Sequence, residues 1–109
     1  MPTVYKILGQ SAPGATTSTD LYTVPSSTQA VVSSIVVANR DSSSATYRIS
    51  CAPDGAALAN AQYIAYDVTI GANDSTVLTL GMTLGDTDKI RVYASTANLT
   101  FTAFGSEIS

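Results

Sequence analysis

Hydrophobic and polar side chains alternate along most of this chain, in short runs separated by clusters of Gly, Pro, Ser, Asn and Asp. Successive side chains of a β-strand point to opposite faces, so a period of two predicts strands with one buried face. Turn signals recur about every 8 to 12 residues, which is typical of sandwiches and barrels. We therefore expect about eight strands, at residues 3–8, 20–24, 29–39, 45–52, 63–70, 75–80, 89–95 and 99–104.

Two of these runs say most about the interior. The longest, residues 29–39 (QAVVSSIVVAN), is rich in β-branched residues and lacks the i, i+3, i+4 spacing of an amphipathic helix, so it predicts a central strand. The last run, residues 99–104, places Leu99 and Phe101 on one face and Phe104 on the other. Because one sheet face normally supplies the core of a sandwich, one of these two aromatic side chains is expected at an interface.

Three segments between the runs predict connections. Residues 9–19 are rich in Ser, Thr, Ala, Pro and Gly, and we expect a loop that contacts a partner. Residues 53–62 (PDGAALANAQ) open on a Pro-Asp-Gly turn signal, which predicts a loop with a short helix at most. Residues 81–88 (GMTLGDTD) hold two glycines and two acids, and they also predict a connection.

A chain of 109 residues has the commonest size of a single domain. We expect one all-β domain over residues 1–109, an antiparallel β-sandwich with either a jelly-roll or an immunoglobulin-like Greek-key topology. The paired Cys and core Trp of immunoglobulin domains are absent from the sequence. The strand order stays open at this point.

Composition changes the picture of the surface. Apolar residues make up 45% of the chain and charged residues only 12%, against roughly 25% in an average soluble domain. Ser and Thr must therefore carry much of the exterior, which suits a protein that packs at high density against copies of itself. The net charge is −3 with five Lys and Arg in total, so a nucleic-acid partner is not expected.

Catalysis is not expected. The chain has no His, so a Ser-His-Asp triad is impossible, and the single Cys51 follows apolar strand residues that predict a buried, inert thiol. Asp86 and Asp88 are spaced i, i+2, but further oxygen ligands for a hard cation are missing, and turn chemistry is the preferred interpretation. No phosphate-binding glycine motif occurs. We predict no enzyme activity, no cofactor and no metal.

Localisation follows from two absences in the sequence. The N-terminal MPTVYKILGQ does not have the basic and apolar regions of a cleaved signal, and no apolar stretch approaches 18 residues. We expect synthesis inside the cell, in the cytoplasm, and no membrane partner.

Six tyrosines suggest two interpretations. They can form a platform on which sugar rings stack, or an amphipathic wall whose hydroxyls reach solvent or an interface. Because the tyrosines lie mostly within strands, the amphipathic wall is the favoured interpretation. Arg48, Lys89 and Arg91 share a sheet face if their strands are neighbours, as a small cation patch offset by Asp67.

Several phrases of the sequence resemble small virion structural proteins of tailed bacteriophages, including phages of cyanobacteria and marine bacteria. They are LYTVP at 21–25, IVVAN at 35–39, YIAYDVTI at 63–70, VYAS at 92–95 and FGSEI at 104–108. The resemblance spans most of the chain, and it does not include a catalytic signature.

This resemblance implies a β-sandwich module of the phage particle, often a trimer. Such a module is a capsid decoration (cement) protein that binds the major capsid protein, or a component of the neck, tail or head fibre. A receptor- or carbohydrate-binding module of the virion is the alternative. The implied location is the virion, with the capsid surface favoured. Predicted partner contacts lie in residues 9–19, 53–62 and 104–109, namely at Ser11, Pro13, Thr16, Pro53, Leu58, Phe104 and Ile108.

Overall fold

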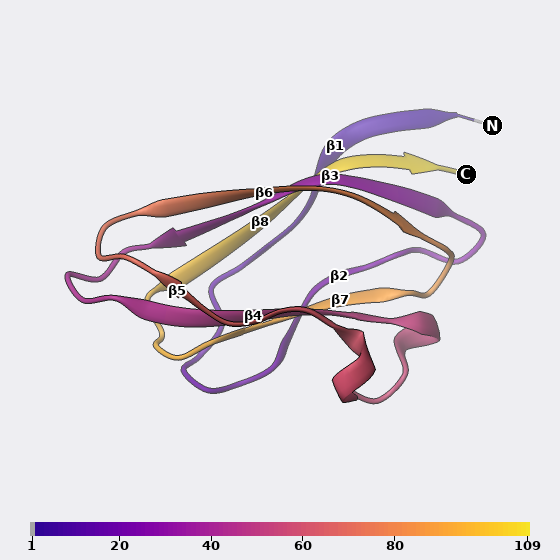
Figure 1. The fold of residues 1–109 in the computed structure, drawn as a ribbon. Helices are drawn as coiled ribbons and strands as arrows, with labels where there is room; N and C mark the ends of the chain where they lie inside the picture. The colour runs from indigo at the N-terminus through magenta and orange to yellow at the C-terminus, as the bar shows by residue number, and fades with distance from the viewer. Residues whose placement is uncertain (1) are drawn as a thin grey trace.

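A computed structural model describes residues 2–109 as a sandwich of two four-stranded sheets, elongated to 45 × 27 × 19 Å (Figure 1). Its strands are β1 (Thr3–Ser11), β2 (Thr19–Thr23), β3 (Gln29–Asn39), β4 (Ala45–Ala52), β5 (Tyr63–Ile70), β6 (Ser75–Leu84), β7 (Lys89–Ala94) and β8 (Leu99–Ile108). Between β4 and β5 lie two short 3-10 turns, η1 (Pro53–Gly55) and η2 (Asn60–Gln62). Within the described part of the chain, no helix has the length and apolar character needed to cross a membrane.

The strand order identifies the topology. One sheet runs β1-β8-β3-β6 and the other β2-β7-β4-β5, and every pairing is antiparallel. An eight-strand sandwich in which the chain passes repeatedly from one sheet to the other is a jelly roll. An immunoglobulin-like domain would place its first two strands side by side in one sheet. The expected all-β sandwich is confirmed, and of the two expected topologies it has the jelly roll.

The core lies between the two inner sheet faces. At its centre the ring of Tyr47 meets that of Phe101 edge to face, with centroids 6.2 Å apart. Strand β8 alternates as the sequence predicts: Leu99 and Phe101 are fully buried, and Phe104 lies on the outer side. The largest fully buried side chains are those of Tyr47, Phe101, Ile35, Ile49, Ile70, Ile90, Leu99, Val24, Val32, Val37 and Val92.

The predicted end of the sixth strand is wrong because the strand continues where the sequence indicates a connection. Strand β6 runs to Leu84, so the first half of the predicted connection at 81–88 is strand. Its register against β3 shifts between Val32 and Ser34, and Gly81 takes a φ of 61° at this point, after which pairing resumes at Met82. A glycine inside a strand marks a bulge here instead of a strand end.

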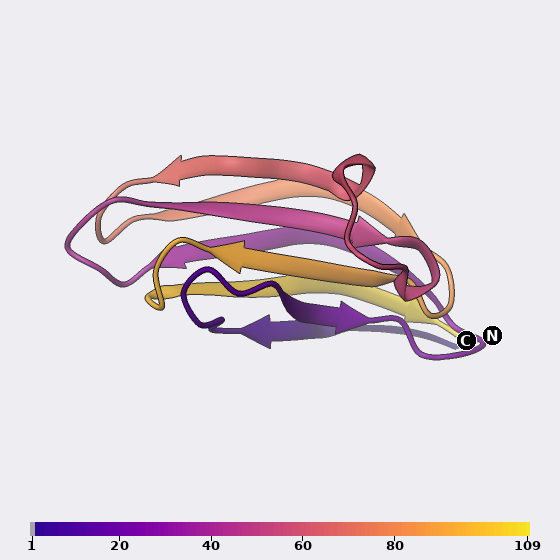
Figure 2. The same ribbon diagram turned by 90° about the horizontal axis from the view of Figure 1, so that it is seen from below.

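The two chain ends also form more strand than expected. Strand β1 continues to Ser11, which shortens the predicted loop at 9–19 to residues 12–18. Strand β8 continues to Ile108, where Thr3 pairs with it, so the termini lie side by side at one end of the sandwich (Figures 1 and 2). The segment 104–109 is therefore mostly a central strand between β1 and β3.

A buried amide joins two turns at one end of the molecule. Asn39 is 3% exposed, and its Nδ2 donates hydrogen bonds to the carbonyl oxygens of Ser43 (2.9 Å) and Gly71 (3.0 Å). Its Oδ1 accepts a hydrogen bond from the backbone N–H of Asp41 at 3.0 Å. Asn39 thus connects the β3–β4 turn to the β5–β6 turn.

Candidate functional site

The outer side of the sheet β1-β8-β3-β6 forms one candidate surface, which we call the uncharged face. Its members alternate with the buried residues of the same strands and face one another across the sheet in the observed register. None of them carries a charge. They include Tyr5, Ile7, Val31, Ser34, Val36, Val77, Thr79, Thr83, Thr102, Phe104 and Ser106.

The uncharged face exposes several large apolar side chains. Tyr5 is 84% exposed, Val77 60% and Ile7 52%. Ile7 lies directly opposite Phe104 across the β1–β8 pair, and Ser34 lies opposite Phe104 on the other side. The cores of protein interfaces are depleted of charged residues and enriched in aromatic ones, so this face has the composition of a contact surface.

The outer side of the sheet β2-β7-β4-β5 is the second candidate surface, which we call the charged face. Arg48 Nε lies 2.7 Å from an oxygen of Asp67. Asp20 Oδ2 accepts a hydrogen bond from Lys89 Nζ at 2.8 Å, and Asp20 Oδ1 lies 3.4 Å from Arg91 Nε. The predicted cation patch is confirmed, because β4 and β7 are neighbours, but Asp67 pairs only with Arg48, while Asp20 pairs with Lys89 and Arg91.

These ion pairs shift the titration of the carboxylates. The hydrogen bond from Arg48 lowers the pKa of Asp67 below its ordinary value. The hydrogen bond from Lys89 is the main cause that lowers the pKa of Asp20, with further contributions from the nearby positive charges of Lys89 and Arg91.

Aromatic side chains gather around Arg48 on the same face. Its guanidinium carbon lies 4.2 Å from the ring centroid of Tyr66 and 4.3 Å from that of Tyr93, which are cation–π distances. Tyr63 meets Tyr66 edge to face, with centroids 4.9 Å apart. The sequence assigns these tyrosines to strands, but their grouping depends on β4, β5 and β7 being neighbours.

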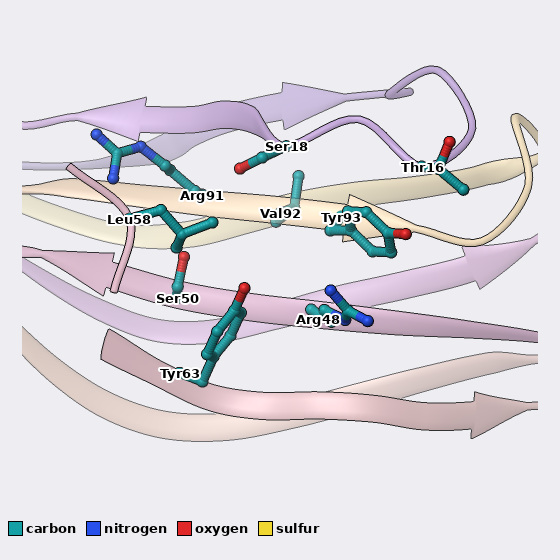
Figure 3. Close-up of a pocket in the computed structure, with 9 residues that line it drawn as sticks. All are labelled: Thr16, Ser18, Arg48, Ser50, Leu58, Tyr63, Arg91, Val92 and Tyr93. Atoms are coloured by element: carbon teal, nitrogen blue, oxygen red, sulfur yellow. The ribbon is translucent and has the colours of Figure 1, made fainter. Parts of the chain in front are cut away.

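A hollow of about 200 Å³ opens on the charged face, next to this aromatic cluster (Figure 3). It lies where two loops, residues 12–18 and 53–62, border the sheet. Its lining residues are Thr16, Ser18, Arg48, Ser50, Leu58, Tyr63, Arg91, Val92 and Tyr93.

The predicted contact residues do not form one surface. Thr16 and Leu58 are exposed and line the hollow, while Phe104 belongs to the uncharged face. Pro13 is buried within its own chain, so the structure leaves it little surface for a partner. Of the remaining predicted residues, Pro53 is exposed, and Ser11 and Ile108 are half-buried.

Of the two acids that raised the question of a cation, Asp86 and Asp88, the second has its carboxylate engaged in turn hydrogen bonds. Asp88 accepts hydrogen bonds from the backbone N–H groups of Gly85 (2.8 Å) and Asp54 (2.9 Å). Among residues 2–109, no group of three or more His, Cys, Asp and Glu side chains is placed to hold a metal ion. Cys51 is half-buried, and burial raises the pKa of its thiol, with a smaller contribution from Asp88, so the reactive thiolate is disfavoured.

Comparison with known proteins adds a structural neighbour. No family model matches the chain, and no curated protein matches it. A chain of the solved structure of infectious bursal disease virus, Gx strain, is similar in fold, with a TM-score of 0.53 and 13% sequence identity. The match covers 97% of this chain and 31% of the viral chain, so this chain spans about a third of its neighbour's length. The likeness concerns the fold alone, and the neighbour belongs to a virus that is not a tailed phage.

Proposed function

We propose that this chain is a non-enzymatic structural protein of a virus particle, and that its uncharged face contacts neighbouring virion subunits. The observation that carries the proposal is an outer sheet face that bears exposed Tyr, Ile, Val and Phe side chains and no charge. A lone soluble domain normally covers such a face with charged residues.

The fold supports a role in a particle. Jelly rolls are common in viral capsid and lectin domains, and the structural neighbour comes from a virus. The phrases from LYTVP to FGSEI carry the proposal further, to a decoration protein of a tailed-phage capsid. A fold alone does not determine function, so the uncharged face is the main argument.

Assembly on a shell suits weak but repeated contacts. A decoration protein binds at many equivalent positions, and copies joined into a homo-oligomer bind with an avidity that exceeds that of a single contact. We propose a homotrimer in which the uncharged face contacts neighbouring copies of the chain as well as the major capsid protein. The low charge of the whole chain, 12% of residues, reduces the repulsion between copies.

Purified virus particles provide the test. Quantitative mass spectrometry of the particle should find hundreds of copies of this chain, and recombinant chain should rebind to particles from which it has been stripped. A dozen copies or fewer would instead indicate the neck, tail or a fibre. Absence of the chain from the particle would overturn the proposal.

A further inference from the structure

We propose that the hollow on the charged face binds one sugar ring of a neutral saccharide. The hollow lies on the opposite side of the sandwich from the uncharged face, so this inference does not depend on the proposed contact with virion subunits. Figure 3 shows the side chains of Ser50, Tyr63 and Tyr93 on one side of the sheet, with Leu58 brought in by the loop at 53–62.

The size of the hollow fits one ring of a longer chain. Its volume of about 200 Å³ lies below the roughly 300–1,000 Å³ of pockets that enclose drug-sized ligands. A ligand held there must therefore be small, or must enter with one unit while the rest extends into solvent between the two loops.

The lining offers both kinds of contact that a sugar ring needs. A sugar presents patches of C–H groups together with hydroxyls that donate and accept hydrogen bonds. Leu58, which is 43% exposed, and the rings of Tyr63 and Tyr93 provide apolar surface. Among the hydrogen bonds between residues 2–109, none involves the phenol hydroxyl of Tyr63 or Tyr93, so both hydroxyls are open to a ligand.

The charges around the hollow favour a neutral ligand over an anion. Two guanidinium groups, those of Arg48 and Arg91, line the hollow, and each already has a carboxylate partner. An anionic ligand would compete with Asp67 and Asp20 for these groups and would be repelled by them. A neutral ligand leaves both ion pairs intact and still accepts hydrogen bonds from unused N–H groups.

The two loops are held in place before any ligand arrives. Arg91 donates hydrogen bonds to the carbonyl oxygens of Ala56 (2.7 Å) and Gly55 (3.2 Å), which fixes one loop over the sheet. The N–H of Thr16 bonds to the carbonyl oxygen of Ala94 at 2.8 Å and fixes the other. Preorganised loops reduce the entropy lost on binding.

Thr16 adds a sign of local strain at the same place. It takes a φ of 54°, which is unfavourable for a β-branched residue. Strained backbone of this kind concentrates at binding sites, where surrounding contacts maintain it. The strain therefore agrees with the position of the hollow.

An NMR titration of the isotope-labelled full chain tests the proposal. The probes are methyl glycosides of neutral hexoses and N-acetylhexosamines, neutral oligosaccharides of several units, and sialylated and sulfated oligosaccharides. We expect at least one neutral probe to shift the resonances of Ser50, Tyr63 and Tyr93. Tighter binding of oligosaccharides than of single rings would point to a surface polysaccharide as the source of the ligand. Equal binding of both would point to a free sugar as the source.

Substitutions locate the site and separate it from the uncharged face. Tyr63→Ala should weaken binding about tenfold or more, because an aromatic contact contributes on the order of 1 kcal/mol and apolar burial adds to it. Leu58→Ala, in an exposed loop, provides a second variant that should weaken binding without disturbing the strands. Tyr5→Ala, on the uncharged face, is the matched control and should bind as the parent chain does.

Three outcomes would overturn the proposal. They are the absence of shifts with every neutral probe at tens of millimolar, shifts that centre on the uncharged face, and binding that requires an anionic probe. Because Tyr5→Ala changes the other face, a failure of virion binding and a failure of sugar binding remain distinguishable.

Discussion

The two outer faces of this sandwich belong to sheets of the same size and pairing, yet they have opposite chemistry. On the charged face every Lys and Arg on strands β4 and β7 has a carboxylate within ion-pair distance, and Arg48 also packs on two tyrosine rings. On the uncharged face, apolar side chains such as Tyr5, Ile7 and Val77 are more than half exposed in the described part of the chain. One face thus pairs its cations with carboxylates of the same chain, while the other exposes an uncharged surface.

The largest expected effect is on assembly through the uncharged face. Phe104→Lys should reduce self-association and particle binding about 100-fold or more, because an unpaired charge in an interface costs several kcal/mol. Phe104 is 37% exposed, so the chain itself should still fold. Sedimentation velocity and a particle-binding assay measure both effects.

Thr69→Lys is the matched control for this substitution. Thr69 is exposed and pairs with Thr46 on the outer side of the other sheet. The Thr69→Lys substitution should leave self-association and particle binding unchanged. Equal loss of assembly in both variants would break the distinction between the faces.

A moderate effect is expected from the central cation of the charged face. Arg48→Ala removes the ion pair with Asp67 and the stacking on Tyr66 and Tyr93, so the melting temperature should fall by a few degrees. Assembly should not change. Arg48→Lys should restore only part of the loss, since an ammonium group lacks the planar stacking of a guanidinium. A full recovery with Lys would contradict a role for stacking.

Acid should remove the stability that the ion pairs of the charged face contribute. Asp20 and Asp67 have pKa values below their ordinary 3.8, so they contribute stability that is present above about pH 4 and lost as the pH falls through the lowered values. The uncharged face contains no Asp, Glu, His, Lys or Arg side chain. Assembly should therefore be constant from about pH 5 to 8, while thermal unfolding shows reduced stability only in stronger acid. A sharp change in the degree of assembly near pH 6 would argue against assembly through the uncharged face.

The smallest expected effect comes from salt. At 1 M salt the screening length falls to about 3 Å, so the exposed ion pairs weaken, and surface ion pairs contribute little to stability. Apolar association does not weaken with salt in this way. Dissociation of the oligomer by sodium chloride, measured by light scattering, would indicate that charged residues hold it together.

Much of the fold is readable from the sequence, because a two-residue period is a local property. Strand β3 and the buried Leu99 and Phe101 of β8 follow from alternation alone. The continuation of β6 past Gly81 is not readable in this way, since a glycine indicates a turn unless a neighbouring strand resumes its pairing.

The sequence predicted the candidate surfaces only in part. The segments 9–19 and 53–62 were predicted as contact segments, and Thr16, Ser18 and Leu58 from them line the hollow. The sequence missed that Tyr63, Tyr66 and Tyr93 meet around Arg48, because these residues come from three different strands. Pro13 illustrates the opposite error, since a proline in a polar loop is expected at the surface and is buried here.

The sequence by itself determined an all-β chain with one inner and one outer side to most strands, and it excluded a His-based active site. Only the tertiary structure decided the jelly-roll order, and with it the separation of charged and uncharged residues onto opposite outer faces. The physical reason is that side-chain alternation depends on neighbours in the chain, whereas the composition of a face depends on which strands hydrogen-bond side by side.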